Sequence, residues 1–334
     1  MDTGVKMKKN ESFLKRIKES SLSGIILFLI IICIVLGIVT PNFLTIYNAK
    51  VILLSAMITA VVGFSQMTII ATGGMNLSVG YIGGLSAIFC ASAMQNWGFA
   101  TVPAILTGLA VGAAAGMVNG LLIAGLGGSG IMSFLITLAT SFAFQGIMQG
   151  YSQANTYNSL NQDFNNIGSA EVLGIPVLAI VMVAIAFLLW FMFKYLGVGR
   201  QILAFGANSQ AATLYGVNAK KTIVISHTLS GLLAACAGIM LSARMSAATI
   251  DIGSDWMLFS FAAPIIGGTR QAGGKVNVWG AMIGAIILST ILNGIVHLNI
   301  SVYWNQFIEG IVILLAIVVD TIRDSEKKNK GIEI

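Results

Sequence analysis

The stretch Thr72-Gly73-Gly74-Met75-Asn76-Leu77-Ser78-Val79-Gly80 interrupts an apolar run that would otherwise continue from Val51 past Phe89. A glycine pair in apolar sequence permits left-handed backbone and ends a helix. Asn76 is suited to cap a helix that restarts at Leu77. A helix that breaks inside a bilayer is tolerated only where protein or a water-filled cavity satisfies its free backbone groups. Two interpretations stay open here: a tight turn between two membrane spans, or a discontinuity that lines a cavity.

The composition around this break is that of a membrane protein. Of the 334 residues, 57% are hydrophobic and 9% are charged, whereas soluble domains carry about 25% charged residues. The sequence therefore predicts an all-α, polytopic membrane protein. Cys33, Cys90 and Cys236 lie far apart in apolar runs without CxxC spacing. We therefore expect neither a disulfide framework nor a metal site.

Ten apolar segments are candidate membrane spans, most of them near the roughly 20 residues that a crossing requires. The eighth is the least regular, because Asp251 and Asp255 fall in its first half. The ten segments divide the chain into a basic tail (1–21), a ten-helix domain (22–322) and a second tail (323–334). The candidate spans are 22–39, 51–71, 77–95, 101–126, 130–151, 173–193, 222–243, 247–266, 278–298 and 303–322.

The positions of the basic residues favour ten crossings. With ten spans, the segments on one side hold six Lys or Arg in the first tail, four in 194–221, two in 267–277 and four in the last tail, together 16 of 18. Only Lys50 and Arg244 then lie on the other side. The positive-inside rule therefore predicts that both tails are cytoplasmic. These positions also explain the net charge of +6 without an acidic partner such as a nucleic acid.

Two glycine patterns indicate close packing. Gly108, Gly112, Gly116 and Gly120 form a strip of small residues on one helix face, which predicts packing within the protomer or in a dimer. The glycines of the break also recur: Gly73, Gly74, Gly80 and Gly84 match Gly273, Gly274, Gly280 and Gly284 at a constant offset of 200. An internal duplication is a hypothesis here, since transporters are often built from repeats, and coincidence is its alternative.

The loop 194–221 contains a short helix that can contact a partner. Asn208 or Ser209 can cap a helix over Gln210–Tyr215, and Gly216 can end it. Its apolar side chains (Ala211, Leu214 and Tyr215) suit a partner's groove or the surface of the membrane.

Motifs for enzymatic chemistry are absent from the sequence. It contains no GxxxxGK[ST] phosphate loop, HExxH or GxSxG, so we expect no ATP binding of that kind and no enzyme activity. Among ionisable groups inside the spans, Glu309 and His227 are the candidates for function, because a charge there is costly. A proton-coupled secondary transporter would use them, although a proton relay normally needs a denser set of groups.

Four motifs in order resemble the membrane subunit of ribose-type ATP-binding-cassette importers, the monosaccharide and autoinducer-2 permease family. Residues 73–80 are similar to the family's GGIDLSVG, and residues 206–218 to its GGNExAAxxSGIN. Residues 229–239 match LSGxLAALAGI, and residues 266–280 are similar to IGGTSLxGGxGxxxG. Together with Asn293-Gly294, they run from about residue 60 to 320.

The resemblance implies a permease subunit for a sugar or sugar-like solute in the bacterial cytoplasmic membrane. It implies a cytoplasmic ATPase that binds the ATP, an extracytoplasmic solute-binding protein, and a second permease copy or a paralogous one. The loop 194–221 would dock on the ATPase through Asn208, Ser209, Ala211, Ala212, Leu214 and Gly216. We expect the break at Gly73, Gly74, Gly273 and Gly274 to border the path. The polar or aromatic side chains chosen as path residues are Gln66, Asn76, Asn119, Gln145, Phe259 and Asn293.

This sequence departs from the family pattern by losing acidic groups. Asn76 stands where Asp is usual, Ser209 where Glu is common, and Trp256–Phe259 where the family has Tyr-Glu-Leu-Asp. These losses fit one half of a heterodimeric permease, or a membrane scaffold that no longer transports. The solute itself is not identified by the sequence.

Overall fold

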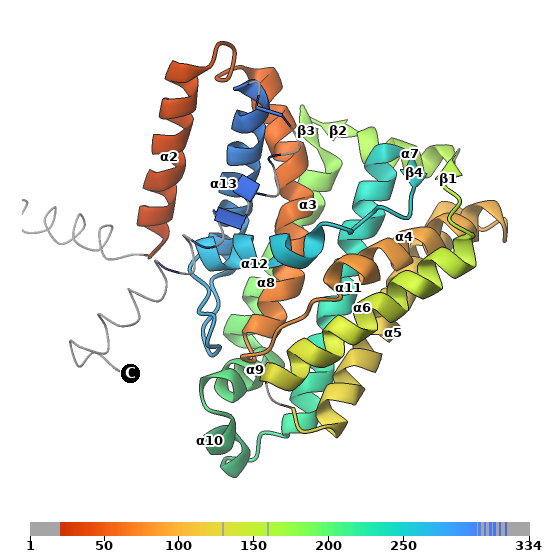
Figure 1. Ribbon diagram of the computed structural model, residues 1–334, viewed down its shortest axis with the longest axis vertical. Helices are drawn as coiled ribbons and strands as arrows, with labels where there is room; N and C mark the ends of the chain where they lie inside the picture. Colours follow the sequence, from red (N-terminus) through yellow and green to blue (C-terminus); the bar gives the residue numbers. More distant parts are fainter. Residues whose placement is uncertain are drawn as a thin grey trace, which may run out of the picture.

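Long apolar helices dominate the computed structural model of the chain (Figure 1), which describes residues 21–318 except 129, 159, 299, 302, 303, 305, 306, 309, 312, 313 and 315–317. Seven helices of the described residues are long and apolar enough to cross a membrane. They are α2 (Ser21–Val39), α3 (Ile46–Ile70), α5 (Thr101–Gly125), α6 (Gly130–Ser152), α8 (Val177–Tyr195), α11 (Ala219–Met245) and α13 (Val278–His297). The predicted all-α membrane fold is therefore confirmed.

Shorter elements connect these helices. Five shorter helices are described: α4 (Val79–Gln95), α7 (Gln162–Ser169), α9 (Gly197–Ala207), α10 (Ser209–Leu214) and α12 (Trp256–Ile266). Two antiparallel pairs of two-residue strands join β1 (Tyr157–Asn158) to β4 (Ala247–Ala248) and β2 (Glu171–Val172) to β3 (Ile175–Pro176). The strands and α7 lie at one end of the molecule, and α9 and α10 lie at the other (Figure 1).

The eighth predicted span is only half a span in the structure. Its helix, α12, has 11 residues, which at 1.5 Å per residue gives about 16 Å, roughly half of the hydrocarbon core. Residues 250–255 ahead of it form turns rather than helix. The first half of this segment, which Asp251 and Asp255 mark as irregular in the sequence, is not helical: α12 begins at Trp256, after Gly253 with its left-handed φ of 85°. The tenth predicted span and both tails lie wholly or largely outside the described residues.

The glycine strip on α5 packs inside the protomer, against α11 and α4. A Cβ atom placed on Gly112 would lie 2.7 Å from the carbonyl oxygen of Gly231, and one on Gly116 would lie 3.0 Å from the Cα atom of Gly231. Toward α4, a Cβ atom on Gly108 would lie 2.8 Å from the carbonyl oxygen of Ser86. The predicted packing role is confirmed, and the partner helices belong to the same chain.

The recurring glycines hold the two ends of α12. On α4, a Cβ atom on Gly80 would overlap the carbonyl oxygen of Gly253, and one on Gly84 would overlap the carbonyl oxygen of Ile252, both just ahead of α12. On α13, a Cβ atom on Gly284 would overlap the carbonyl oxygen of Ala263 near the end of α12. The two glycine sets therefore let α4 and α13 contact the two ends of α12 directly, because only glycine allows backbones to approach so closely.

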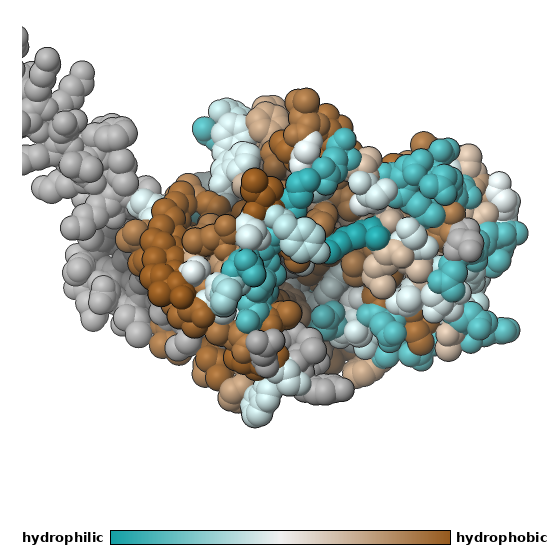
Figure 2. All heavy atoms as spheres, turned by 90° about the horizontal axis from the view of Figure 1, so that it is seen from above, coloured by the Kyte–Doolittle hydropathy of each residue, from teal (hydrophilic) through white to brown (hydrophobic). Residues whose placement is uncertain are grey.

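Charge and hydropathy separate the two ends from the flanks. The end with α9 and α10 carries exposed Lys194, Arg200, Lys220 and Lys221, as well as Arg270 and Lys275 of the hairpin after α12. At the opposite end Lys50 forms an ion pair with Glu171, with 2.9 Å between Nζ and Oε2. Figure 2 looks down on that end and shows hydrophilic residues across it, with hydrophobic residues on the flank.

The packing of α5 on α11 gives a testable prediction. Gly116→Val should lower the free energy of unfolding by about 3 kcal/mol, the upper end of the usual cost of over-packing, because the opposing backbone atoms cannot rotate away. Gly24→Val on α2 is the matched control, since nothing lies within 4 Å of a Cβ atom there. Titration of the detergent-solubilised protein with a denaturing detergent measures both, and equal stability of the two variants would contradict the packing described.

Candidate functional site

The connection between α3 and α4 is a buried break rather than a surface turn. Gly73 adopts a left-handed φ of 75°, and α4 begins only at Val79. The sequence suggested that Asn76 caps a helix beginning at Leu77. In the structure it does not, because Ser78 is the N-cap of α4. The side-chain Oδ1 of Asn76 instead accepts hydrogen bonds from the backbone N–H of Ser78 (3.0 Å) and from the Ser78 hydroxyl (2.7 Å). Asn76 and Ser78 are both fully buried.

Side chains from two neighbouring helices satisfy the backbone of this break. With its amide oriented so that both atoms are satisfied, Gln66 of α3 donates to the carbonyl oxygen of Asn76 (2.9 Å) and accepts from its N–H (3.2 Å). From α6, the Ser133 hydroxyl donates to the carbonyl oxygen of Met75 (2.6 Å). The Thr137 hydroxyl accepts from the N–H of Leu77 (3.1 Å). Each bond replaces one that helix geometry would have supplied.

The same break is tied to α5 and α11 through a chain of neutral groups. The amide nitrogen of Asn76 donates to the Ser230 hydroxyl of α11 (3.1 Å), which lies 2.9 Å from the hydroxyl of Ser65 on α3. From α5, the amide nitrogen of Asn119 donates to the Ser78 hydroxyl (2.7 Å). We call this set the amide–hydroxyl network: Ser65, Gln66, Asn76, Ser78, Asn119, Ser133, Thr137 and Ser230. Every member is buried, at 3% exposure or less.

In this conformation the break fits neither of the two interpretations that the sequence left open. Protein side chains from α3, α5, α6 and α11 satisfy its polar groups, so the break is neither a solvated turn nor, in this conformation, the wall of an open cavity. Three of the predicted path residues, Gln66, Asn76 and Asn119, are brought together here. The only local signal for Ser133 and Thr137 was their polarity in an apolar span.

The other predicted path residues lie outside this network. Gln145 of α6, Phe259 of α12 and Asn293 of α13 are all half-buried, and none makes a hydrogen bond to the network among the described residues. The side-chain Oδ1 of Asn293 is buried without a hydrogen-bond partner in the described part of the chain. His227 is fully buried on α11, where Gly116 and Gly120 of α5 pack against it. Glu309 lies outside the described residues.

A second break follows α12 and has its own amide. Gly273 and Gly274 adopt left-handed φ angles of 91° and 77° in the hairpin before α13. Asn277 caps α13 by accepting from the N–H of Gly280 (3.0 Å), and its amide nitrogen donates to the carbonyl oxygen of Gly267 (3.0 Å). Sequence reasoning missed Asn277, although a polar residue between the glycine pair 273–274 and Gly280 was the available signal.

The cytoplasmic loop predicted over 194–221 is largely helical. Asn208 caps α10 through its Oδ1, which accepts from the N–H of Ala211 (2.9 Å), and Gly216 ends the segment with a φ of 85°. Leu214 and Tyr215 are 88% and 91% exposed. Helix α9 was not predicted, because its three glycines obscured the helical pattern. Within the described part of the chain, these two large apolar side chains are almost uncovered.

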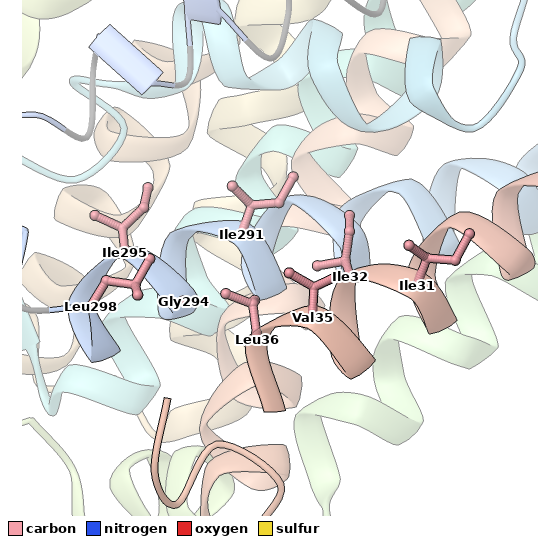
Figure 3. A pocket seen from close by; sticks show the side chains of 8 residues that line it. All are labelled: Ile31, Ile32, Val35, Leu36, Ile291, Gly294, Ile295 and Leu298. Atoms are coloured by element: carbon pink, nitrogen blue, oxygen red, sulfur yellow. The ribbon is translucent and has the colours of Figure 1, made fainter. Parts of the chain in front are cut away.

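An apolar groove of about 250 Å³ lies between α2 and α13 (Figure 3). Its lining contributes almost no polar surface, so it offers nothing to orient a polar solute. The lining residues are Ile31, Ile32, Val35, Leu36, Ile291, Gly294, Ile295 and Leu298. Among the described residues, no group of three or more His, Cys, Asp or Glu could hold a metal ion.

Comparisons with known proteins agree over most of the chain. Residues 48–317 match the family described as the branched-chain amino acid transport system permease component. No solved structure matches.

Three curated relatives are bacterial permeases. The ribose import permease protein RbsC of Bacillus subtilis (strain 168) is 36% identical, covering 89% of this chain and 92% of the relative. The D-allose transport system permease protein AlsC of Escherichia coli (strain K12) is 34% identical, covering 89% and 90%. The galactose/methyl galactoside import permease protein MglC of the same strain is 29% identical, covering 95% and 98%.

The amide of Gln66 gives a testable prediction. Gln66→Leu should lower the free energy of unfolding by about 2–5 kcal/mol, because the buried N–H and C=O of Asn76 each lose a partner. Ser289→Ala is the matched control, since the buried hydroxyl of Ser289 has no hydrogen-bond partner among the described residues, and its removal should be nearly neutral. Denaturation in detergent measures both changes. An unchanged stability in Gln66→Leu would show that the break does not depend on this amide.

Proposed function

Because the chain belongs to the family of branched-chain amino acid transport system permease components, we propose that it is the permease subunit of a bacterial ABC importer for a sugar or sugar-like solute. The observation that carries this proposal is the match to ribose, allose and galactose permeases along nearly their whole length. The relatives' names favour a sugar over an amino acid. The protein is a multi-pass membrane protein and a transport subunit rather than an enzyme.

We propose ten membrane crossings with both tails cytoplasmic. The ten crossings are the seven long helices, the buried helix α4, the half-span α12 together with the turns ahead of it, and the predicted segment 303–322. Six exposed basic residues lie at the end that holds α9 and α10, which the positive-inside rule assigns to the cytoplasm. Lys50 and Arg244 belong to the opposite end, and both are engaged: Lys50 pairs with Glu171, and Arg244 donates to the carbonyl oxygen of Leu54 (2.8 Å).

Helix α10 is the proposed docking element for the ATPase. Leu214 and Tyr215 project from it almost fully exposed, and an exposed aromatic beside an aliphatic side chain suits a pocket on a protein partner. Asn208, Ser209, Ala211 and Gly216 shape the helix, whereas Ala212 is buried at 6% exposure and supports it from within. ATP would be bound by the partner subunit.

We propose that the central path is closed in this conformation and that the amide–hydroxyl network closes it. Gln66, Asn76 and Asn119 are sealed in this conformation, and alternating access would require the network to open as the helices move. Gln145, Phe259 and Asn293 remain proposed path residues on α6, α12 and α13. A solute-binding protein would deliver the solute at the end with α7 and the strands, and a second permease copy or a paralogue would complete the pair.

The test of this function is transport by the reconstituted complex. We expect ATP-dependent uptake of at least one of radiolabelled ribose, allose and galactose when the chain is combined with its ATPase and binding protein in liposomes. Uptake by the chain alone under a proton gradient would establish a secondary transporter instead. ATPase stimulation without uptake of any solute would establish the scaffold interpretation.

The docking role of α10 gives a further prediction. The double variant Leu214→Glu and Tyr215→Glu should bind the ATPase at least about tenfold more weakly, because two large apolar contacts are lost. Membrane insertion should be unchanged, since both side chains are exposed. Leu173→Glu is the control: Leu173 is 98% exposed on the β2–β3 turn at the opposite end. Wild-type affinity in the double variant would rule out docking through α10.

A further inference from the structure

Three segments that are distant in sequence meet beside α10. They are residues 71–73 after α3, residues 206–207 at the end of α9, and residues 272–274 in the hairpin before α13. The backbone N–H of Gly274 donates to the carbonyl oxygen of Ala71 (3.1 Å), which joins the first break directly to the second. We call this contact the glycine junction, formed by Ala71, Gly73, Gly206, Gly273 and Gly274.

The glycine junction is made of backbone against backbone. A Cβ atom on Gly206 would overlap the carbonyl oxygen of Ala71 and lie 2.8 Å from the nitrogen of Gly274. A Cβ atom on Gly273 would lie 2.8 Å from both the carbonyl oxygen of Gly206 and the nitrogen of Gly73. Among the described residues, the atoms nearest to these two hypothetical Cβ atoms all belong to the backbone, and the one side chain in contact with Gly274 is that of Ala207, which has no rotamer to change.

The position of Gly206 connects α10 to both breaks. Ala207 and the capping residue Asn208 follow Gly206 directly, so the junction lies one residue before α10 is capped. The first break leads into α4 and the second into α13, the two helices that hold the ends of α12. One contact therefore joins the proposed ATPase-docking helix to both helices that seat the half-span.

Helix α9 is built to act as a lever at this contact. At its start, a Cβ atom on Gly199 would lie 2.6 Å from the Cα atom of Phe193, so α9 packs tightly on the last turn of α8. At its end, Gly206 is wedged between Ala71 and Gly274. Gly199 and Gly206 are seven residues apart, which in an α-helix places these two supports about 10 Å from each other. A rotation of α9 about Gly199 would displace both breaks together.

We propose that the glycine junction transmits the movement of α10 to both helix breaks and thereby couples the ATPase to the opening of the path. This inference rests on the proposed function. The alternative route from α10 runs through Val217 and Asn218 into α11. Because α10 has these two connections, one on each side, a change in either can be compared with the same change in the other.

The experiment inserts one glycine on either side of α10. An insertion between Ala207 and Asn208 adds slack of up to about 3.5 Å on the junction side, and one between Val217 and Asn218 adds it on the α11 side. Both leave the residues of α10 unchanged. We expect the first insertion to lower the solute transported per ATP hydrolysed at least tenfold, with ATPase binding retained. We expect the second to keep at least half of the wild-type ratio.

Three results would overturn the proposal. If the insertion before Asn208 keeps its coupling, the junction does not transmit the movement. Loss of coupling only in the insertion after Val217 would place the route in α11. An equal loss in both insertions would show that α10 needs both connections and that the junction has no special part.

A second readout requires no solute. In a background without Cys33, Cys90 and Cys236, Met75→Cys places a thiol in the first break, where Met75 is half-buried. Its labelling rate with a maleimide should differ at least threefold between the ATP-bound and ADP-bound complex, and the insertion before Asn208 should abolish this difference. A rate independent of the nucleotide in the uninterrupted chain would refute the junction proposal. If no sugar is taken up, the proposed solute class fails, yet this labelling still decides the role of the junction.

Discussion

A backbone N–H or C=O group inside a membrane must find its partner within the protein, and the residues between α3 and α4 are where this constraint acts most strongly. The chain meets it with side chains brought from far away in sequence: Gln66 from α3, Ser133 and Thr137 from α6, with Asn76 binding Ser230 of α11. The surrounding helices are thus held around the break by hydrogen bonds to backbone groups that would otherwise have no partner. Helix α4 begins there, and 14 of its 17 residues are buried.

Close backbone contact is the second device that organises the molecule. Glycines on α5 allow α11 to pack closely, and glycines on α4 and α13 allow the two ends of α12 to do so. Gly206 allows the backbone of both breaks to lie against α9. Without a hydrophobic driving force between helices in lipid, such contacts gain their stability from dispersion and from the fit of the two surfaces. A half-span of 11 residues can persist in the centre of the protein only because its ends are fixed in this way.

Sequence reasoning predicted the features that depend on local pattern. The apolar runs gave the long helices, the four-residue glycine spacing gave the packing face of α5, and Asn208 with Gly216 marked the ends of α10. The features that were missed depend on tertiary contacts. Nothing local shows that the Gln66 amide faces the backbone of Asn76, or that Gly80 of α4 packs against the backbone of Gly253. Helix α9 was not predicted because glycine has a low helix propensity, whereas the glycines of α9 are present for close packing.

The amide–hydroxyl network consists only of carboxamides and hydroxyls, because Asn76 stands at its centre where the resemblance leads one to expect a carboxylate. Such groups bear no net charge at any physiological pH. Moving a unit charge through the bilayer field involves about 2.3 kcal/mol per 100 mV, whereas rearranging neutral dipoles involves far less. The free energy that holds this neutral network together should therefore depend little on the membrane potential.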